Sequence, residues 1–366
     1  DTTFILKDEV SLYGGFAGTE TCPVQRVDFR MGGANETILS GDINKNGITD
    51  AANANRIMYG KEISAATTLD GLTISGGYAD ATSGEDGGGL RLASSSPMIT
   101  NCTIFDNFAS DNGGGFYIFT SSGLPSSLPT VTGCYFVKNY ANDKGGGAYT
   151  GTGCDAVFTN CVFENNEVRD DDGAAFYVWC SSPVVMNCTF VRNVVPGDEH
   201  GAAVAVDNSS TAPVTMSPSF INSVFWGNLV GAAAGEDIYL FDGLDSPATI
   251  TNCALEGTHT ATGATATGTV DISSTDPLFV NTSGTAGTAG HDAAADWDIQ
   301  TSSVLISAGL AAGAPGMDVN SNFRDATIDI GAYEFGATVP LIIATDITGP
   351  GSVTPNGAYL VSGSDQ

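Results

Sequence analysis

The stretch NCTIFDNFASDNGGGFYI, residues 101–118, decides the fold because the chain repeats it. Near-copies are GCYFVKNYANDKGGGAYT from Gly133, NCVFENNEVRDDDGAAFYV from Asn160 and NCTFVRNVVPGDEHGAAVAV from Asn187. Each copy contains a triplet of glycine or alanine, and successive triplets start 32, 28 and 28 residues apart. A looser copy, LDGLTISGG from Leu69, extends the pattern upstream. Repetition at such a period is typical of a protein built from stacked structural units.

Three columns of equivalent residues run through the copies. A cysteine column is followed two residues later by a phenylalanine or aliphatic column, and five residues later by an asparagine column. The first column contains Cys102, Cys134, Cys161, Cys188, Ser223 and Cys253; the second contains Ile104, Phe136, Phe163, Phe190, Phe225 and Leu255; the third contains Asn107, Asn139, Asn166, Asn193 and Asn228. These columns predict side chains that lie directly above one another.

Each copy holds two or three short runs with period-two alternation, which indicates strands. Units this short cannot bury a face alone, so they must stack, with neighbouring strands about 4.8 Å apart. Because parallel crossovers are right-handed, the predicted fold is an all-β, right-handed parallel β-helix, a solenoid of the pectate-lyase type. A sandwich or a propeller is the alternative. The lack of hairpin turns and the length of the units, below about 40 residues, count against these two folds.

The columns also predict roles in packing. We expect the cysteine column to behave as small buried apolar groups, and the asparagine column to bind backbone groups of the turns. If a disulfide forms, Cys154 and Cys180 are the favoured pair, because they occupy similar places in adjacent units.

The composition limits the classes of partner. The chain has 41 acidic residues against 12 lysines and arginines among 366 residues, a net charge of −29. Nucleic acid binding requires basic residues, so this charge argues against it, and against anionic membranes and acidic sugars. No apolar run approaches the ~20 residues of a membrane-spanning helix. The balance favours solubility, cation binding or life in salty water.

The units resemble the repeats of polymorphic outer-membrane proteins, with their small-residue triplets and their FxxN element. More broadly, the chain resembles the bacterial secreted right-handed parallel β-helix repeat proteins. The similar stretches are VSLYGGFAGTET (10–21), TILSGDI (37–43), LDGLTISGG (69–77), DPLFV (276–280) and DIGAYEF (329–335). This resemblance implies an extracellular protein or one on the outer cell surface of a bacterium.

The resemblance covers residues 1–336, which we predict to form one β-helix domain with an insertion at 42–56. Residues 337–366 are predicted as a strand or linker and the start of a further β module. The chain opens within an alternating pattern, TFILKDEVSLYGGF from Thr3, so we expect a mature form or a fragment of a longer precursor.

The insertion carries the sharpest local motif, DINKNGITD. Oxygen-bearing residues alternate along it, with a glycine at the sixth position, as in the first part of a calcium loop. The twelfth position, where such a loop needs glutamate, is Asn53. A surface turn rich in asparagine and aspartate is the alternative. The candidate Ca²⁺ ligands are Asp42, Asn44, Asn46, the carbonyl of Ile48 and Asp50.

Acidic residues precede each triplet and would run down one edge of the stack. A solvated acidic edge is one interpretation, and a stripe of divalent-cation sites is the other. These residues are Glu85, Asp86, Asp111, Asp143, Asp170, Asp171, Asp172, Asp198, Glu199, Glu236 and Asp237.

Catalysis is the weaker hypothesis. Asp171, Asp172 and His200, with Gly201, superficially resemble the clustered aspartates and the His-Gly pair of galacturonan hydrolases. However, they fall at equivalent loop positions one coil apart, and no basic partner motif accompanies them.

Outward-facing aromatic residues suggest a binding surface. A solvent-facing tyrosine ladder would stack on sugar rings or contact a partner protein. The alternative is that the ladder stabilises the sheet or lies under a long loop. The ladder consists of Tyr117, Tyr149, Tyr177 and Tyr239; Tyr135, Val137, Val224 and Trp226 also face outward.

Together these patterns predict a non-catalytic extracellular or cell-surface β-helix protein with an adhesive or structural role, stabilised by calcium. Its expected partners are glycans or other surface and matrix proteins. One alternative is a carbohydrate-active β-helix hydrolase or lyase. Another is a filament or sheath subunit that assembles through the ends of the β-helix or through the tail.

Overall fold

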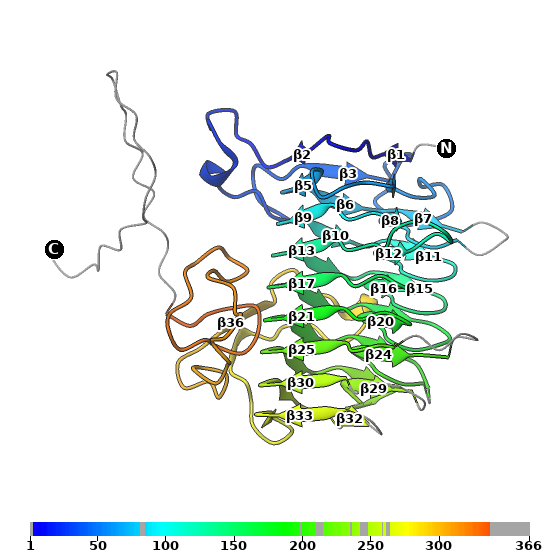
Figure 1. Ribbon diagram of the computed structural model, residues 1–366. Helices are drawn as coiled ribbons and strands as arrows, with labels where there is room; N and C mark the ends of the chain where they lie inside the picture. Colours follow the sequence, from blue (N-terminus) through cyan, green and yellow to red (C-terminus); the bar gives the residue numbers. More distant parts are fainter. Residues whose placement is uncertain are drawn as a thin grey trace, which may run out of the picture.

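The computed structural model describes residues 3–80, 85–197, 199–209, 215–234, 236–241, 248–257, 259–260 and 264–336. Stacked coils of short strands make up most of this part of the chain (Figure 1). Its helices are two 3-10 turns, η1 (Pro23–Gln25) and η2 (Thr288–Gly290). Across the described ranges, no helix is long and apolar enough to cross a membrane. The predicted all-β parallel solenoid is confirmed.

Strands of successive coils pair in parallel and in register to form four sheets. Sheet A contains β1 (Phe4–Ile5), β4 (Met58–Lys61), β8 (Leu90–Ala93), β12 (Phe116–Phe119), β16 (Ala148–Thr150), β20 (Phe176–Trp179), β24 (Val204–Asp207), β29 (Ile238–Leu240) and β32 (His259–Thr260). Sheet B contains β2 (Leu12–Tyr13), β5 (Thr68–Asp70), β9 (Met98–Thr100), β13 (Thr130–Thr132), β17 (Val157–Thr159), β21 (Val184–Met186), β25 (Ser219–Ile221), β30 (Thr249–Thr251) and β33 (Thr265–Thr267). Sheet C contains β3 (Ile38–Ser40), β6 (Thr73–Ser75), β10 (Thr103–Phe105), β14 (Tyr135–Val137), β18 (Val162–Glu164), β22 (Thr189–Val191), β26 (Val224–Trp226), β31 (Ala254–Leu255) and β34 (Val270–Asp271).

Sheet D is built from two-residue strands, which is why the sequence predicted two or three strands per unit where a full coil has four. Its parallel strands are β7 (Tyr78–Ala79), β11 (Phe108–Ala109), β15 (Tyr140–Ala141), β19 (Glu167–Val168), β23 (Val194–Val195) and β27 (Leu229–Val230). β28 (Ala233–Ala234) pairs antiparallel with β27 at the end of this sheet.

The corner that precedes the cysteine column requires a left-handed backbone. Its residues have φ near +50 to +63°, as at Asn101, Gly133, Asn160 and Asn187. Asparagine and glycine tolerate this conformation better than other residues, which explains their recurrence at the start of each copy.

The interior of the solenoid consists of the predicted columns. Cys102, Cys134, Cys161, Cys188 and Cys253 are fully buried. Phenylalanine rings stack along the axis, with centroids 4.5 Å apart for Phe136 and Phe163 and 4.7 Å apart for each of the next two pairs. All eight cysteines lie in the described ranges and none of them is in a disulfide, so the favoured bond between Cys154 and Cys180 is not formed.

A ladder of buried asparagines joins the coils at the corner between sheets C and D. The Nδ2 group of Asn139 donates to Oδ1 of Asn166 at 3.1 Å and to the carbonyl of Ile104, in the previous coil, at 2.9 Å. The Asn139 backbone N–H also donates to Oδ1 of Asn166. The same pattern recurs at Asn107, Asn166 and Asn193. Every asparagine therefore satisfies groups of two neighbouring coils.

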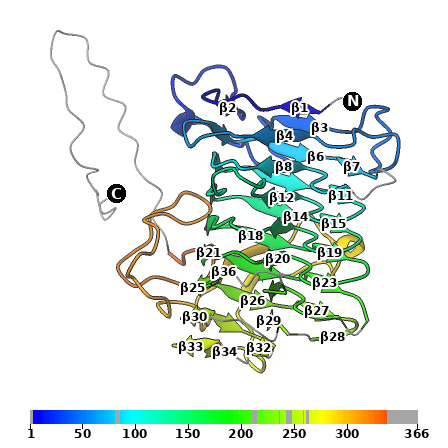
Figure 2. The ribbon, with the colours of Figure 1, turned by 45° about the vertical axis from the view of Figure 1, so that its right-hand side comes forward.

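After the last coil, residues 272–336, called here the covering segment, fold back over the outer face of sheet C (Figures 1 and 2, yellow to orange). The segment contains an antiparallel pair, β35 (Phe279–Asn281) and β36 (Asp296–Ile299). Its Phe279, Trp297 and Ile330 pack with Val191 and Val224 of the sheet in a second apolar core. The stretches DPLFV and DIGAYEF belong to this segment. Tyr135 and Trp226, predicted to face solvent, lie beneath it and are partly buried because its apolar side chains cover them.

Two arginines hold the covering segment in place. Arg30, from an early loop, donates to the carbonyl of Val319 at 2.5 Å and to that of Gly133 at 3.0 Å. Arg324 forms a buried ion pair with Glu334 within the segment at 2.7 Å, and it donates to Oδ1 of Asn160, in the solenoid, at 3.0 Å. The covering segment is therefore tied to the solenoid by polar bonds as well as by apolar packing.

Replacing Asn166 by alanine should break the asparagine ladder in its centre. The N–H and Nδ2 groups of Asn139 would lose an acceptor, and the carbonyl of Phe136 would lose a donor. A buried polar group left without a partner costs about 1–3 kcal/mol, so we expect the free energy of unfolding to fall by about 3–5 kcal/mol in denaturant titrations. The half-buried Asn142→Ala is the matched control. Equal effects of the two substitutions would contradict a role for the ladder.

Candidate functional site

Three of the four tyrosines of the predicted ladder stack on one another, but two of these three do not face solvent. The rings of Tyr117, Tyr149 and Tyr177 stack with centroids 5.0 and 5.4 Å apart. Tyr149 is 6% exposed and Tyr177 is 1% exposed. The hydroxyl of Tyr177 donates to Asp207, and Lys144 lies over its ring. The prediction of a solvent-facing ladder is therefore wrong for the two central tyrosines, because neighbouring side chains, including one from a pre-triplet loop, cover them.

Tyr239 lies apart from the other three tyrosines. Ala205 occupies the position between Tyr177 and Tyr239 on the paired strands, so the stack of rings is interrupted. Tyr239 instead stacks against the imidazole of His200 at 4.1 Å.

A different set of aromatic residues forms a partly exposed ladder on sheet D. Tyr78, Phe108 and Tyr140 stand at equivalent positions of β7, β11 and β15 (Figure 2, right-hand edge). Their ring centroids are 4.5 and 5.7 Å apart, with interplanar angles of 27° and 19°. All three are half-buried, whereas the alanine that follows each of them is fully buried. These three residues are called the aromatic strip.

The aromatic strip forms part of a groove of about 400 Å³. Gly47, Ile48 and Thr49 of the insertion line it, as do Thr288 and Ala289 of η2. Lys138 and Asp106, also in the lining, form an ion pair at 3.3 Å. The groove therefore combines a stacked apolar surface with charged and hydroxyl groups.

The candidate calcium loop borders this groove, and its oxygen atoms organise its backbone. The carboxylate of Asp42 accepts the N–H groups of Asn46 at 3.1 Å and of Gly47 at 2.8 Å. Oδ1 of Asn46 accepts the N–H of Ile48, and Nδ2 of Asn46 donates to Asp50 at 2.9 Å. The loop thus gathers the predicted residues within one turn, with Gly47 at φ +72°.

Hydrogen bonds attach the insertion to the coils beside the aromatic strip. Thr49 donates to the carbonyl of Asp106 at 3.1 Å, and Asn53 donates to that of Gly76 at 2.9 Å. Burial, together with the carboxylates of Asp80 and Asp50, raises the pKa of Tyr78. The loop and the aromatic strip are therefore one connected structure.

The acidic residues before the triplets do not form an uninterrupted stripe. Basic residues pair with several of them: Arg56 with Glu85 at 2.8 Å, Arg91 with Asp86 at 3.6 Å, and Lys144 with Asp171 at 2.5 Å. Asp198 lies outside the described residues. Asp237 lies in the interior, where it accepts a hydrogen bond from Asn228 at the end of the asparagine ladder.

Among the described residues, oxygens of Asp171, Asp172 and Glu199 lie within 4.8 Å of one another. His200 contacts this cluster through its backbone N–H, which donates a hydrogen bond to Asp172 at 2.5 Å. Its imidazole lies 3.6 Å from Glu236. The structure therefore brings together the two predicted aspartates, but the imidazole interacts elsewhere.

Neighbouring groups separate the pKa values of these two aspartates. Burial and the adjacent Asp171 raise the pKa of Asp172 to about 8. Burial acts in the same direction on Asp171, but hydrogen bonds from Asp172 and Lys144 outweigh it and lower the pKa of Asp171. Asp172 is therefore a proton-binding group of the folded protein near neutral pH.

Comparison with known proteins bears on the fold. The family described as "Right handed beta helix region" matches residues 31–195 and 129–276, which together make up more than half of the chain. This description agrees with the predicted hand of the solenoid. No curated protein matches the chain.

Replacing Asp172 by asparagine should remove a pH-dependent loss of stability. The folded protein binds a proton at Asp172 with a pKa of about 8, against an ordinary 3.8, so this group destabilises the fold progressively as pH rises from about 4 to about 8. The amide can still accept from His200 and keeps a donor toward Asp171. We expect the melting temperature of the variant to exceed that of the wild type at pH 8, with little difference at pH 4.5. The exposed Asp170→Asn is the control for the change in charge; equal pH profiles of all three proteins would contradict this role.

Proposed function

We propose that this chain, which belongs to the right-handed β-helix family, is a non-catalytic, calcium-stabilised protein of the extracellular space or outer cell surface of a bacterium, with an adhesive role. Its ligand is a neutral glycan bound in the groove of sheet D. The observation that carries the proposal is the aromatic strip, a partly exposed row of stacked rings beside the insertion.

The groove suits a sugar chain in shape and in chemistry. Because the rings stack on one another, they present a continuous row of ring edges along the axis, against which the apolar C–H groups of successive sugar rings can pack. Contacts with aromatic rings contribute about 0.5–1.5 kcal/mol each. Thr49, Asp106 and Lys138 supply donors and acceptors for hydroxyl groups. The net charge of −29 disfavours acidic polysaccharides, so we propose a neutral glycan as the ligand of this groove.

Calcium would be held by Asp42, Asn44, Asn46, the carbonyl of Ile48 and Asp50. Two carboxylates, two amide oxygens and one carbonyl are hard oxygen donors of the kind that Ca²⁺ prefers. When bound, the ion would neutralise the two carboxylates and fix the turn. Ile48 and Thr49 of this turn line the groove, so the loop also positions part of the glycan site.

A non-catalytic role is favoured by the contacts of the candidate acid and base groups. Asp171 forms an ion pair with Lys144, and the His200 ring stacks on Tyr239, so the three residues do not form a set in which the imidazole contacts an aspartate side chain. The proposed tail-mediated assembly rests on residues 337–366, outside the described part.

Calcium should raise the thermal stability of the protein. We expect the melting temperature of chelator-treated protein to increase by several degrees on addition of millimolar Ca²⁺, because binding to the folded state alone stabilises it by mass action. Asp42→Asn should abolish the increase, whereas Asp155→Asn, in a different corner, should leave it intact. An unchanged melting temperature of the wild type would contradict the calcium site.

Neutral oligosaccharides should bind to the aromatic strip. We expect at least one of cellohexaose, xylohexaose and mannohexaose to bind in calorimetry, and oligogalacturonate not to bind. Phe108→Ala combined with Tyr140→Ala should weaken binding roughly tenfold or more, since two stacked rings contribute about 1–3 kcal/mol. Tyr13→Ala, an exposed tyrosine of the first coil, is the control. Absence of binding by all three neutral oligosaccharides, or an affinity that the double substitution leaves unchanged, would contradict the proposed function.

A further inference from the structure

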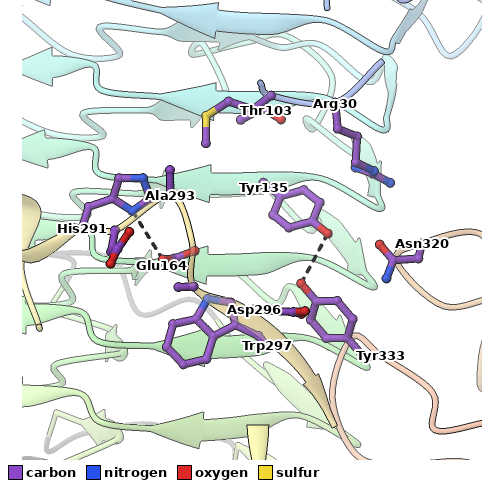
Figure 3. A pocket seen from close by; sticks show the side chains of 13 residues that line it. Arg30, Thr103, Tyr135, Glu164, His291, Ala293, Asp296, Trp297, Asn320 and Tyr333 are labelled. Carbon is purple, nitrogen blue, oxygen red and sulfur yellow. Dashed lines mark hydrogen bonds and ion pairs between the residues drawn. The ribbon is translucent and has the colours of Figure 1, made fainter. Parts of the chain in front are cut away.

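A second cavity, of about 250 Å³, lies between the outer face of sheet C and the covering segment (Figure 3). Sheet C contributes Thr103, Tyr135 and Glu164, and the covering segment contributes His291, Trp297 and other residues. This cavity lies on a different sheet from the aromatic strip, and none of the residues that line it lines the proposed glycan groove.

Glu164 is the unusual residue of this cavity. The equivalent positions of neighbouring coils, Val137 and Val191, are apolar. The Glu164 residue is only 6% exposed, and its Oε1 has no hydrogen-bond partner in the described part of the chain. Nδ1 of His291 lies 3.4 Å away and forms an ion pair with this oxygen when the imidazole is protonated, but neither atom makes a hydrogen bond (Figure 3). A buried carboxylate without a hydrogen bond is costly, and a ligand that donates to it would recover this free energy.

The charges around the cavity favour a cationic ligand. Three carboxylates line it, from Glu164, Asp292 and Asp296. They outnumber the guanidinium of Arg30 and the imidazole of His291, which is charged only when protonated. The Arg30 group is directed to the carbonyls of Gly133 and Val319. It also lies over the ring of Tyr135 at 4.9 Å. An anionic ligand would therefore meet more repulsion than attraction.

Trp297 adds a second requirement, that the ligand carry a hydrogen-bond acceptor. Its side chain is 2% exposed, and its indole Nε1 has no acceptor among the described residues. A ligand must therefore offer an acceptor oxygen as well as a cationic donor. Tyr135 and Tyr333, whose hydroxyl groups lie 3.3 Å apart, supply aromatic surface at the other end of the cavity (Figure 3).

We propose that this cavity binds an amino sugar, with the protonated amino group against Glu164 and a hydroxyl oxygen accepting from the Trp297 indole. An amino sugar combines a cation, several hydroxyl acceptors and an apolar ring face in one compact molecule. Amino acids fit less well, because their carboxylate would add to the negative charge of the cavity.

Calorimetry with D-glucosamine and D-glucose tests the proposal. We expect glucosamine at pH 6 to bind at least tenfold more tightly than glucose, and Glu164→Gln to reduce its affinity at least tenfold. Tyr140→Ala, in the aromatic strip, should leave glucosamine binding unchanged, which separates this site from the proposed glycan groove. Equal affinities for the two sugars, or an unchanged affinity of Glu164→Gln, would overturn the proposal.

A spectroscopic readout is available if Glu164→Gln does not fold. The chain has three tryptophans, so its indole N–H signals in a ¹⁵N-labelled sample can be assigned by substitution. Glucosamine should shift the Trp297 signal and leave that of Trp179, on sheet A, in place. Titration without a shift at Trp297 would refute binding in this cavity.

Discussion

The structure depends on a continuous ladder of buried amides. Corner residues of a β-helix cannot use all their backbone groups in sheet hydrogen bonds, and burying these groups requires another partner. From Asn107 to Asn228, each side-chain amide supplies that partner to two coils at once. The ladder therefore sets the register of one coil on the next, and the phenylalanine stack inside and the aromatic strip outside follow from it. It ends at Asp237, whose pKa burial raises to about 7.

The inner columns could be predicted because every coil places the same residue type in the same environment. The exposure of residues on the outer faces could not be predicted, since it depends on which other parts of the chain pack against them. Tyr149 and Tyr177 are covered by nearby side chains, and Trp226 is covered by a segment that lies more than 40 residues further along the chain. The residue directly after the asparagine column did carry a signal, because it is aromatic in Phe108 and Tyr140. Strands of two residues, however, show no alternation that would draw attention to it.

The two candidate sites also differ in how far the sequence alone could predict them. The calcium motif is contiguous, so its spacing alone identified the residues that the loop gathers. The amino-sugar cavity combines Arg30, Glu164, Trp297 and Tyr333, which no local pattern connects. Glu164 itself was visible as a carboxylate within an outward column of apolar residues. That Glu164 is buried could not be predicted, because its burial depends on the covering segment that packs over this outward position.

The bond from Arg30 to Val319 joins residues 289 positions apart in the chain. A solenoid whose coils contact only their neighbours can unravel one coil at a time from either end. Here the covering segment packs across β18, β22 and β26 and is hydrogen-bonded to a loop of the first coils. It therefore connects the middle of the stack to its beginning from the outside. A mechanical force applied beyond residue 336 would load the contacts of the covering segment before it loaded any coil. The solenoid is thereby shielded from tension by a part of the chain that belongs to no coil.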